Sequence, residues 1–209
     1  MTKETLLKNT DVFLFDLDGT VYLGETLIGD VRNTLGCLRD MNKRIFYLTN
    51  NSSKAEEEYV KKLTRIGVYD GRDTVYTSAM AAAEYVAAHF SGKRVYLLAT
   101  DAVKAEFSRT VPLVEDDPEI VILAYDTTLD FGKMKLFNEF LAKGAYYIAT
   151  HPDAVCPTAG VSMPDVGSFI ELFFASSGRR PDIVIGKPGT VMGECMERRL
   201  SVPRSRMCM

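Results

Sequence analysis

The chain is poor in histidine, and this scarcity disfavours several kinds of chemistry. Only His89 and His151 occur among its 209 residues, and none of its four cysteines are paired at the spacing of metal ligands. A structural zinc site, a histidine-rich catalytic metal site and histidine-phosphatase chemistry are therefore not expected. The scattered cysteines show no disulfide framework, which is typical of reduced thiols in an intracellular protein.

The chain also lacks a strong charge and a long apolar run. Its 25 basic and 28 acidic residues leave a formal net charge of −3, so a nucleic-acid partner is not expected. No apolar run reaches the roughly 18 residues of a membrane span. The first ten residues, MTKETLLKNT, do not have the pattern of a signal or transit peptide. These absences predict a cytoplasmic protein that does not act at a membrane.

What is present is a globular composition in which short apolar runs alternate with helical patterns. With 46% hydrophobic residues, the chain is long enough for a core domain with an insertion. The expected strands are 11–17, 44–48, 74–77, 94–99, 120–125, 145–150 and 182–185. The expected helices are 30–41, 53–66, 79–90, 136–141, 168–176 and 190–200, with Asp30 and either Ser52 or Ser53 as N-caps. A small hairpin is expected at Gly24. This alternation predicts the α/β class with a doubly wound parallel sheet.

The most informative motif is FDLDGT, residues 15–20, at the end of the first expected strand. Asp16 and Asp18 are two positions apart, so they share a face of a strand and converge beyond its carboxyl end, where open α/β sheets bind ligands. Two close carboxylates predict a bound divalent cation or a raised pKa on one of them. Gly19 permits a turn and the close approach of an anion. The alternative is an acidic strand end followed by an ordinary Asp-Gly turn.

This motif resembles the first motif, Asp-x-Asp-Gly-Thr, of the haloacid dehalogenase (HAD) superfamily of phosphohydrolases. The resemblance implies that Asp16 is the nucleophile, which forms an aspartyl-phosphate. It implies that Asp18 protonates the leaving oxygen and later deprotonates the hydrolytic water. Mg²⁺ would be held by Asp16 and by the backbone carbonyl of Asp18. Gly19 and Thr20, which complete the motif, are candidate phosphate-binding residues.

Two later segments resemble the second and third motifs of the superfamily in the same order. Thr49 in FYLTNNSS would bind phosphate oxygens through its hydroxyl, and Asn50 and Asn51 would face the substrate. Lys187 in IVIGKPGT would neutralise the phosphate charge, which stabilises the transferring phosphoryl group. The alternatives are a plain turn and helix cap after Thr49 and a solvated lysine at 187.

The long separation of Thr49 from Lys187 resembles the class IIA branch, the NagD-like and p-nitrophenylphosphatase group, in which an α/β cap is inserted there. The segment ATHPDAVCPTAGVSMPDVGSF resembles the cap loop of that group. We therefore expect a Rossmann-like HAD core in residues 1–79 and 182–209 and a cap in residues 80–181. His151 and Asp153 are candidate substrate-selecting residues, with a plain turn as the alternative.

The fourth motif of the superfamily, a Gly-Asp followed by a second Asp, is not found after Lys187. The final residues SVPRSRMCM fall where its strand would begin, so we expect a core that is truncated at its C-terminal end. The expected function is Mg²⁺-dependent hydrolysis of small phosphorylated metabolites: sugar phosphates, nucleoside monophosphates or aryl phosphates. The alternative is a catalytically impaired member that binds phosphoryl ligands or acts as an interaction protein. The alanine-rich helix near 79–90 is expected either to pack in the core or to line a homodimer contact.

Overall fold

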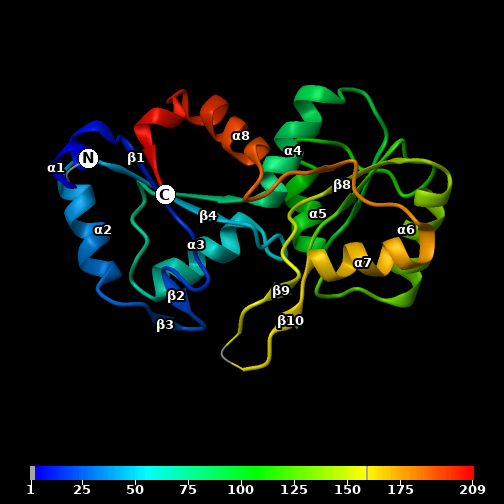
Figure 1. The fold of residues 1–209 in the computed structure, drawn as a ribbon, viewed down its shortest axis with the longest axis horizontal. Helices are drawn as coiled ribbons and strands as arrows, with labels where there is room; N and C mark the ends of the chain where they lie inside the picture. The colour runs from blue at the N-terminus through cyan, green and yellow to red at the C-terminus, as the bar shows by residue number, and fades with distance from the viewer. Residues whose placement is uncertain (1–2, 159) are drawn as a thin grey trace.

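The computed structural model of the chain describes residues 3–158 and 160–209. Two parallel sheets form the centres of two lobes (Figure 1). The first sheet has the order β12 (Met207–Cys208), β1 (Val12–Phe15), β4 (Arg44–Thr49) and β5 (Thr74–Thr77). The second has the order β11 (Ile183–Val184), β8 (Tyr146–Ala149), β7 (Ile120–Leu123) and β6 (Val95–Leu98). The α/β fold with parallel sheets is confirmed.

The strands of the first sheet are mostly apolar because both faces of this sheet are covered. Along β4, Phe46 and Leu48 pack into one apolar cluster, whereas Ile45 and Tyr47 pack into another on the opposite face. The cluster that contains Phe46 also contains Leu97 and other side chains from the second sheet. Side chains from the two sheets therefore pack together in one apolar cluster.

Helices and two small hairpins complete the chain. The helices are α1 (Lys3–Asn9), α2 (Val31–Asp40), α3 (Glu56–Arg65), α4 (Ser78–His89), α5 (Asp101–Phe107), α6 (Phe131–Ala142), α7 (Val166–Ser177) and α8 (Thr190–Leu200), with a 3₁₀ turn at Arg204–Arg206. The antiparallel hairpins are β2 (Tyr22–Leu23) with β3 (Thr26–Leu27), and β9 (Val155–Cys156) with β10 (Met163–Pro164). None of the described helices is long and apolar enough to cross a membrane.

Three details of local structure differ from the sequence-based expectation. The first strand ends at Phe15, because the Leu17 carbonyl accepts the N–H groups of Val21 and Tyr22 and closes a tight turn. Helix α3 begins at Glu56 with Ala55 as its N-cap, so the expected cap at Ser52 or Ser53 is wrong. The expected cap at Asp30 is at the right position, but its side chain makes no capping hydrogen bond.

Several elements were not predicted, namely α1, α5, the hairpin of β9 and β10, and the short strand β12. The alanine-rich helix α4 has six buried residues and packs against α8, as the core-packing alternative requires.

The expected division into residues 1–79, 80–181 and 182–209 stays a prediction. One observation bears on its last boundary, because β11 pairs with β8 and so belongs to the second sheet. The second lobe therefore extends to at least Val184.

Candidate active site

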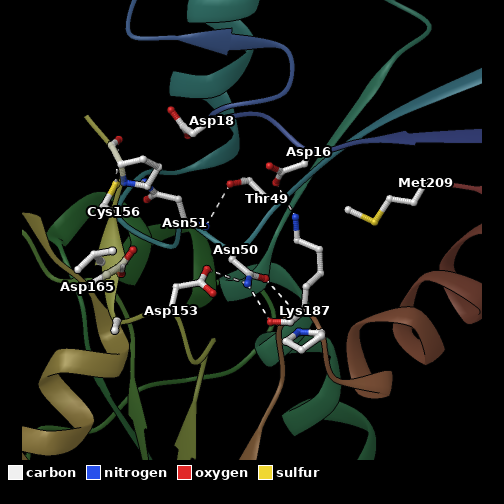
Figure 2. Close-up of a pocket in the computed structure, with 14 residues that line it drawn as sticks. Asp16, Asp18, Thr49, Asn50, Asn51, Asp153, Cys156, Asp165, Lys187 and Met209 are labelled. Carbon is white, nitrogen blue, oxygen red and sulfur yellow. Dashed lines mark hydrogen bonds and ion pairs between the residues drawn. The ribbon is translucent and has the colours of Figure 1, made fainter. Parts of the chain in front are cut away.

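The two carboxylates of the first motif lie at the end of β1 and line a cavity of about 590 Å³ (Figure 2). Asp16 directly follows the strand, and the tight turn at Leu17 brings Asp18 to the same cavity. Gly19 adopts φ +85° and donates its N–H to the Tyr22 carbonyl at 2.8 Å. This left-handed conformation favours glycine because it crowds the Cβ of any other residue. The turn, rather than strand alternation, therefore places both acids.

Thr49 and Lys187 reach the same cavity from two other loops. Thr49 ends β4, which lies parallel to β1, so both strands end at the same edge of the sheet. The Lys187 ammonium lies 2.5 Å from Asp16 Oδ1 and donates to the Leu48 carbonyl at 3.1 Å. Thr49 Oγ1 accepts the N–H of Asn51 at 3.1 Å, which leaves its own proton for a ligand. Four residues predicted to be catalytic thus converge on one cavity.

Asn50 lines the cavity, but both the oxygen and the nitrogen of its side-chain amide form hydrogen bonds with the protein. Its Oδ1 accepts the N–H of Lys187 at 2.9 Å, and its Nδ2 donates to the Lys187 carbonyl at 3.0 Å. The same Nδ2 donates to Asp153 Oδ2 at 2.9 Å. Asn50 therefore ties together the loops that carry Lys187 and Asp153, which is a different role from the expected contact with phosphate.

Asn51 also lines the cavity and fixes the turn that follows β4. Its Oδ1 accepts both the N–H and the hydroxyl of Ser53, at 3.0 and 2.7 Å. Its Nδ2 lies 3.8 Å from the Sγ of Cys156, which belongs to β9. Asn51 therefore lines the cavity and also contacts the second lobe through Cys156.

The last two residues of the first motif, which are candidate phosphate-binding residues, lie outside the cavity wall. Gly19 and Thr20 are exposed and are not among the residues that line the cavity. The Thr20 hydroxyl instead donates to Asp16 Oδ2 at 3.5 Å. Thr20 therefore contacts the Asp16 carboxylate, and phosphate binding by Gly19 and Thr20 stays a prediction.

His151, a candidate substrate-selecting residue, is fully buried and is not among the residues that line the cavity, so any part that it has in substrate selection would be indirect. Its Nε2 is 2.9 Å from Asp165 Oδ1, and its Nδ1 is 3.1 Å from Thr150 Oγ1. Asp153, the second candidate on this segment, does line the cavity. His151 thus reaches the cavity only through Asp165, which lines it and is held by the imidazole.

Asp165 and Cys156 line the cavity and were not singled out from the sequence. Asp165 is the N-cap of α7 and accepts the N–H of Val166 at 2.7 Å. An Asp before an apolar helical run is a recognisable capping signal. That signal does not reveal that the same carboxylate faces a cavity built mostly from other loops.

The carboxylate of Asp18 is electrostatically distinct from that of an exposed aspartate. Burial raises its pKa above the usual value of 3.8, and the charge of Asp16 raises it further, whereas Lys62 and Lys54 oppose the shift. Burial likewise raises the pKa of the Cys156 thiol, so this thiol is not an activated nucleophile. A raised pKa favours the protonated form of Asp18, which is the form that a general acid needs.

The donors beside Asp16 fit a Mg²⁺ ion, although they do not form a complete cage. Among the described residues, no group of three or more His, Cys, Asp or Glu side chains is arranged to hold a metal. Mg²⁺ commonly takes one or two carboxylates and keeps several waters, so the Asp16 carboxylate and the backbone carbonyl of Asp18 would be sufficient protein ligands. The raised pKa of Asp18 also marks a place where added positive charge is favourable.

Comparisons with known proteins agree with this geometry. Residues 13–110 match the haloacid dehalogenase-like hydrolase family. The structure superimposes on the 4-nitrophenylphosphatase of Thermotoga maritima with a TM-score of 0.91 and 37% identity, over 97% of this chain and 78% of that one. The chain belongs to the haloacid dehalogenase-like hydrolases.

Curated relatives of this HAD chain carry phosphatase names. The acid sugar phosphatase of Staphylococcus saprophyticus is 30% identical over 97% of this chain and 79% of its own length. Phosphoglycolate phosphatase 2 of Arabidopsis thaliana is 29% identical over 99% of this chain and 77% of its own length. A putative NagD protein also superimposes with a TM-score of 0.91 and 36% identity, over 99% of this chain and 80% of that one. Together with the 4-nitrophenylphosphatase, it places the chain on the NagD-like and p-nitrophenylphosphatase branch of the HAD phosphatases.

Proposed function

We propose that the chain is a Mg²⁺-dependent phosphomonoester hydrolase that acts on small phosphorylated metabolites. Sugar phosphates, nucleoside monophosphates and aryl phosphates are the candidate substrates. The observation that carries the proposal is the approach of the Lys187 ammonium to Asp16 Oδ1, at 2.5 Å, in a cavity that Asp18 and Thr49 also line. This set supplies a nucleophile, a proton donor and two phosphate-binding groups within one site.

In the first step, an Asp16 carboxylate oxygen attacks phosphorus as the bond from phosphorus to the leaving oxygen breaks. Asp18, protonated because burial raises its pKa, donates its proton to the leaving oxygen. The Lys187 ammonium and the Thr49 hydroxyl bind the phosphoryl oxygens and stabilise their charge. The product alcohol departs and leaves an aspartyl-phosphate on Asp16.

In the second step, Asp18 accepts a proton from a water molecule that attacks the phosphoryl group. The bond between Asp16 and phosphorus breaks, inorganic phosphate is released and both acids return to their starting states. Asp16 and the backbone carbonyl of Asp18 would hold Mg²⁺. When bound, the ion offsets the repulsion between the carboxylates and the phosphate.

We also propose that the second lobe acts as a cap over this site. Asp153 and Cys156 line the cavity from that lobe, whereas Asp16 and Thr49 line it from the first sheet. Closure of the lobes around a substrate would exclude water from the reacting groups. A cytoplasmic location and a homodimer remain predictions, the second of which sedimentation of the purified chain would test.

The test is Mg²⁺-dependent release of phosphate from p-nitrophenyl phosphate. We expect Asp16→Asn to lower kcat by at least about 10³-fold, because the amide is a poor nucleophile. Asp116→Asn, at an exposed position remote from the cavity, is the matched control and should retain full activity. Full activity of Asp16→Asn would overturn the mechanism.

The second candidate function is binding of a phosphoryl ligand without turnover. It is favoured by the small number of carboxylates that gather near Asp16 in the described residues. A binder would be stabilised against heat by phosphate or a phosphate ester and would release no product. The same assay, run beside a thermal melt, therefore separates the two functions.

A further inference from the structure

The wall of the cavity that lies opposite the first motif carries two carboxylates. Asp153 and Asp165 line the cavity from the second lobe, whereas Asp16 and Asp18 line it from the first sheet (Figure 2). In Figure 2, Asp153 and Asp165 lie in the lower half of the view, and Asp16 and Asp18 lie in the upper half. With the phosphate placed at Asp16, as in the proposed function, Asp153 and Asp165 line the part of the same cavity that is left for the rest of the ester.

Asp165 is held rigidly with one oxygen uncommitted. Its side chain is almost fully buried, and Oδ1 accepts both the Val166 N–H at 2.7 Å and the His151 Nε2 hydrogen bond at 2.9 Å. His151 is itself fixed by Thr150 Oγ1 at 3.1 Å. Among the described residues, nothing donates to Asp165 Oδ2, which leaves this oxygen to accept a hydrogen bond from a ligand.

Asp153 is fixed in a similar way on the same wall. Its Oδ2 accepts from Asn50 Nδ2 at 2.9 Å, and its backbone carbonyl accepts the N–H of Gly167 at 2.7 Å. Its Oδ1 has no donor among the residues that the structure describes. The wall thus presents two placed acceptor oxygens. The other residues of this segment that line it, 154–157, are apolar apart from the thiol of Cys156.

Positive charge is confined to the phosphate end of the cavity. Of the described residues that line it, only Lys187 is a cation, and its ammonium is bound to Asp16 Oδ1 and the Leu48 carbonyl. Lys54 and Lys62 act on Asp18, on the side of the first motif, and the Lys62 ammonium sits 3.5 Å from the centre of the Tyr22 ring. No cation of the described wall is thus placed to pair with an acidic leaving group.

We infer that this cavity selects phosphate esters whose far end donates hydrogen bonds, through hydroxyl or ammonium groups, and rejects esters whose far end is a carboxylate. The inference rests on the proposed function, because that function places the phosphate at Asp16. Hydroxyl and ammonium groups satisfy the free oxygens of Asp153 and Asp165. A carboxylate would lie next to two like charges and leave those oxygens without a donor.

The experiment uses three phosphonates that cannot be hydrolysed and that differ only at the end remote from phosphorus. These are 3-hydroxypropylphosphonate, 3-aminopropylphosphonate and 3-phosphonopropionate, whose ends are a hydroxyl, an ammonium and a carboxylate. Binding to the unaltered chain is measured by calorimetry with Mg²⁺ present. We expect the hydroxyl and ammonium ligands to bind at least tenfold more tightly than the carboxylate ligand.

Two variants assign the discrimination to the wall. Asp165→Asn keeps an oxygen for the Val166 N–H and for His151, and Asp153→Asn keeps an acceptor for Asn50, so both should fold. Each is expected to narrow the preference at least threefold, mainly by tightening the binding of 3-phosphonopropionate. Asp116→Asn, the exposed control, should leave the preference unchanged.

Several outcomes overturn the inference. One is carboxylate binding as tight as hydroxyl binding, another is an unchanged preference in both variants, and a third is no binding of any phosphonate by a chain that hydrolyses p-nitrophenyl phosphate. Loss of the proposed function looks different, since p-nitrophenyl phosphate is then not turned over while calorimetry still reports the preference. The two failures are therefore distinguishable.

Discussion

At the scale of single residues, the site depends on carboxylates held in unlike surroundings. Asp16 is paired with the Lys187 ammonium, whereas Asp18 is half-buried and has a raised pKa. The two residues are two positions apart and share a side-chain type, so in the proposed mechanism only their environments separate the nucleophile from the proton donor. Such an arrangement favours activity at the expense of stability, because the ionised form of Asp18 is poorly solvated.

We expect Asp18→Asn to stabilise the chain at neutral pH while lowering kcat about 10²- to 10⁴-fold. Because the folded-state pKa of Asp18 is raised, the stability that its proton binding contributes is fully present below the ordinary pKa. That contribution is lost as the pH rises through the raised value. Thermal melts without Mg²⁺ should show a gain of up to about 1 kcal/mol at pH 7, since the carboxylate is only half-buried.

The gain should shrink as the pH falls below the raised pKa, where the unaltered chain carries a neutral Asp18. A gain that is the same at acid and neutral pH would show that charge burial is not its cause. A lower melting temperature at pH 7 would contradict the prediction outright.

At the scale of elements, the conformation of the loop after β11 requires glycine at position 186, because a larger residue would clash there. A Cβ on Gly186 would lie 2.6 Å from Asn50 Oδ1 and 2.7 Å from the Thr150 carbonyl. These contacts are shorter than carbon and oxygen atoms allow, and one of them is to backbone that cannot rotate away. The loop that carries Lys187 can therefore approach Asn50 only with glycine at this position.

We expect Gly186→Ala to destabilise the chain by about 1–3 kcal/mol and to lower kcat, because the methyl group displaces the Lys187 loop. Gly193→Ala is the matched control, since its Cβ would meet Arg204 at an ordinary 3.6 Å in the middle of α8. That change should instead stabilise the chain by about 0.5–1 kcal/mol. Denaturant unfolding and p-nitrophenyl phosphate turnover measure both effects; equal changes for the two variants would contradict the argument.

At the scale of the whole molecule, polar contacts join the two lobes beside the shared apolar core. Ser52 Oγ lies 2.9 Å from Thr150 Oγ1 and accepts the N–H of Tyr125 at 2.9 Å. The Asn50 amide adds the bond to Asp153 on the second lobe. Because these groups are largely buried, losing one partner leaves another unsatisfied, at a cost of about 1–3 kcal/mol.

We expect Asn50→Ala to destabilise the chain by about 1–3 kcal/mol and to lower kcat/KM about 10- to 100-fold, because the loops of Lys187 and Asp153 lose their common partner. Asn33→Ala, on the exposed face of α2, is the control and should change neither quantity appreciably. Unfolding and steady-state kinetics provide the readouts. An Asn50→Ala chain of full stability with only a raised KM would show that Asn50 contacts the ligand instead.

The sequence by itself determined the class of the fold and the acids at its first strand. Apolar runs and caps are local patterns, so β1, β4, β7, β8 and α8 could be recognised without knowledge of their neighbours. The motif at Asp16 and Asp18 is equally local. Short elements such as β12 and α5 were not predicted, because so few residues do not show a recognisable hydrophobic periodicity.

Only the tertiary structure decided which side chains line the cavity. His151 and Asp165 are close in sequence, yet the packing of α7 buries the imidazole and turns the carboxylate to the cavity. Asn50 meets Asp153 103 residues away and Lys187 137 residues away. Such contacts depend on how one sheet is set against the other, and no spacing along the chain encodes that geometry.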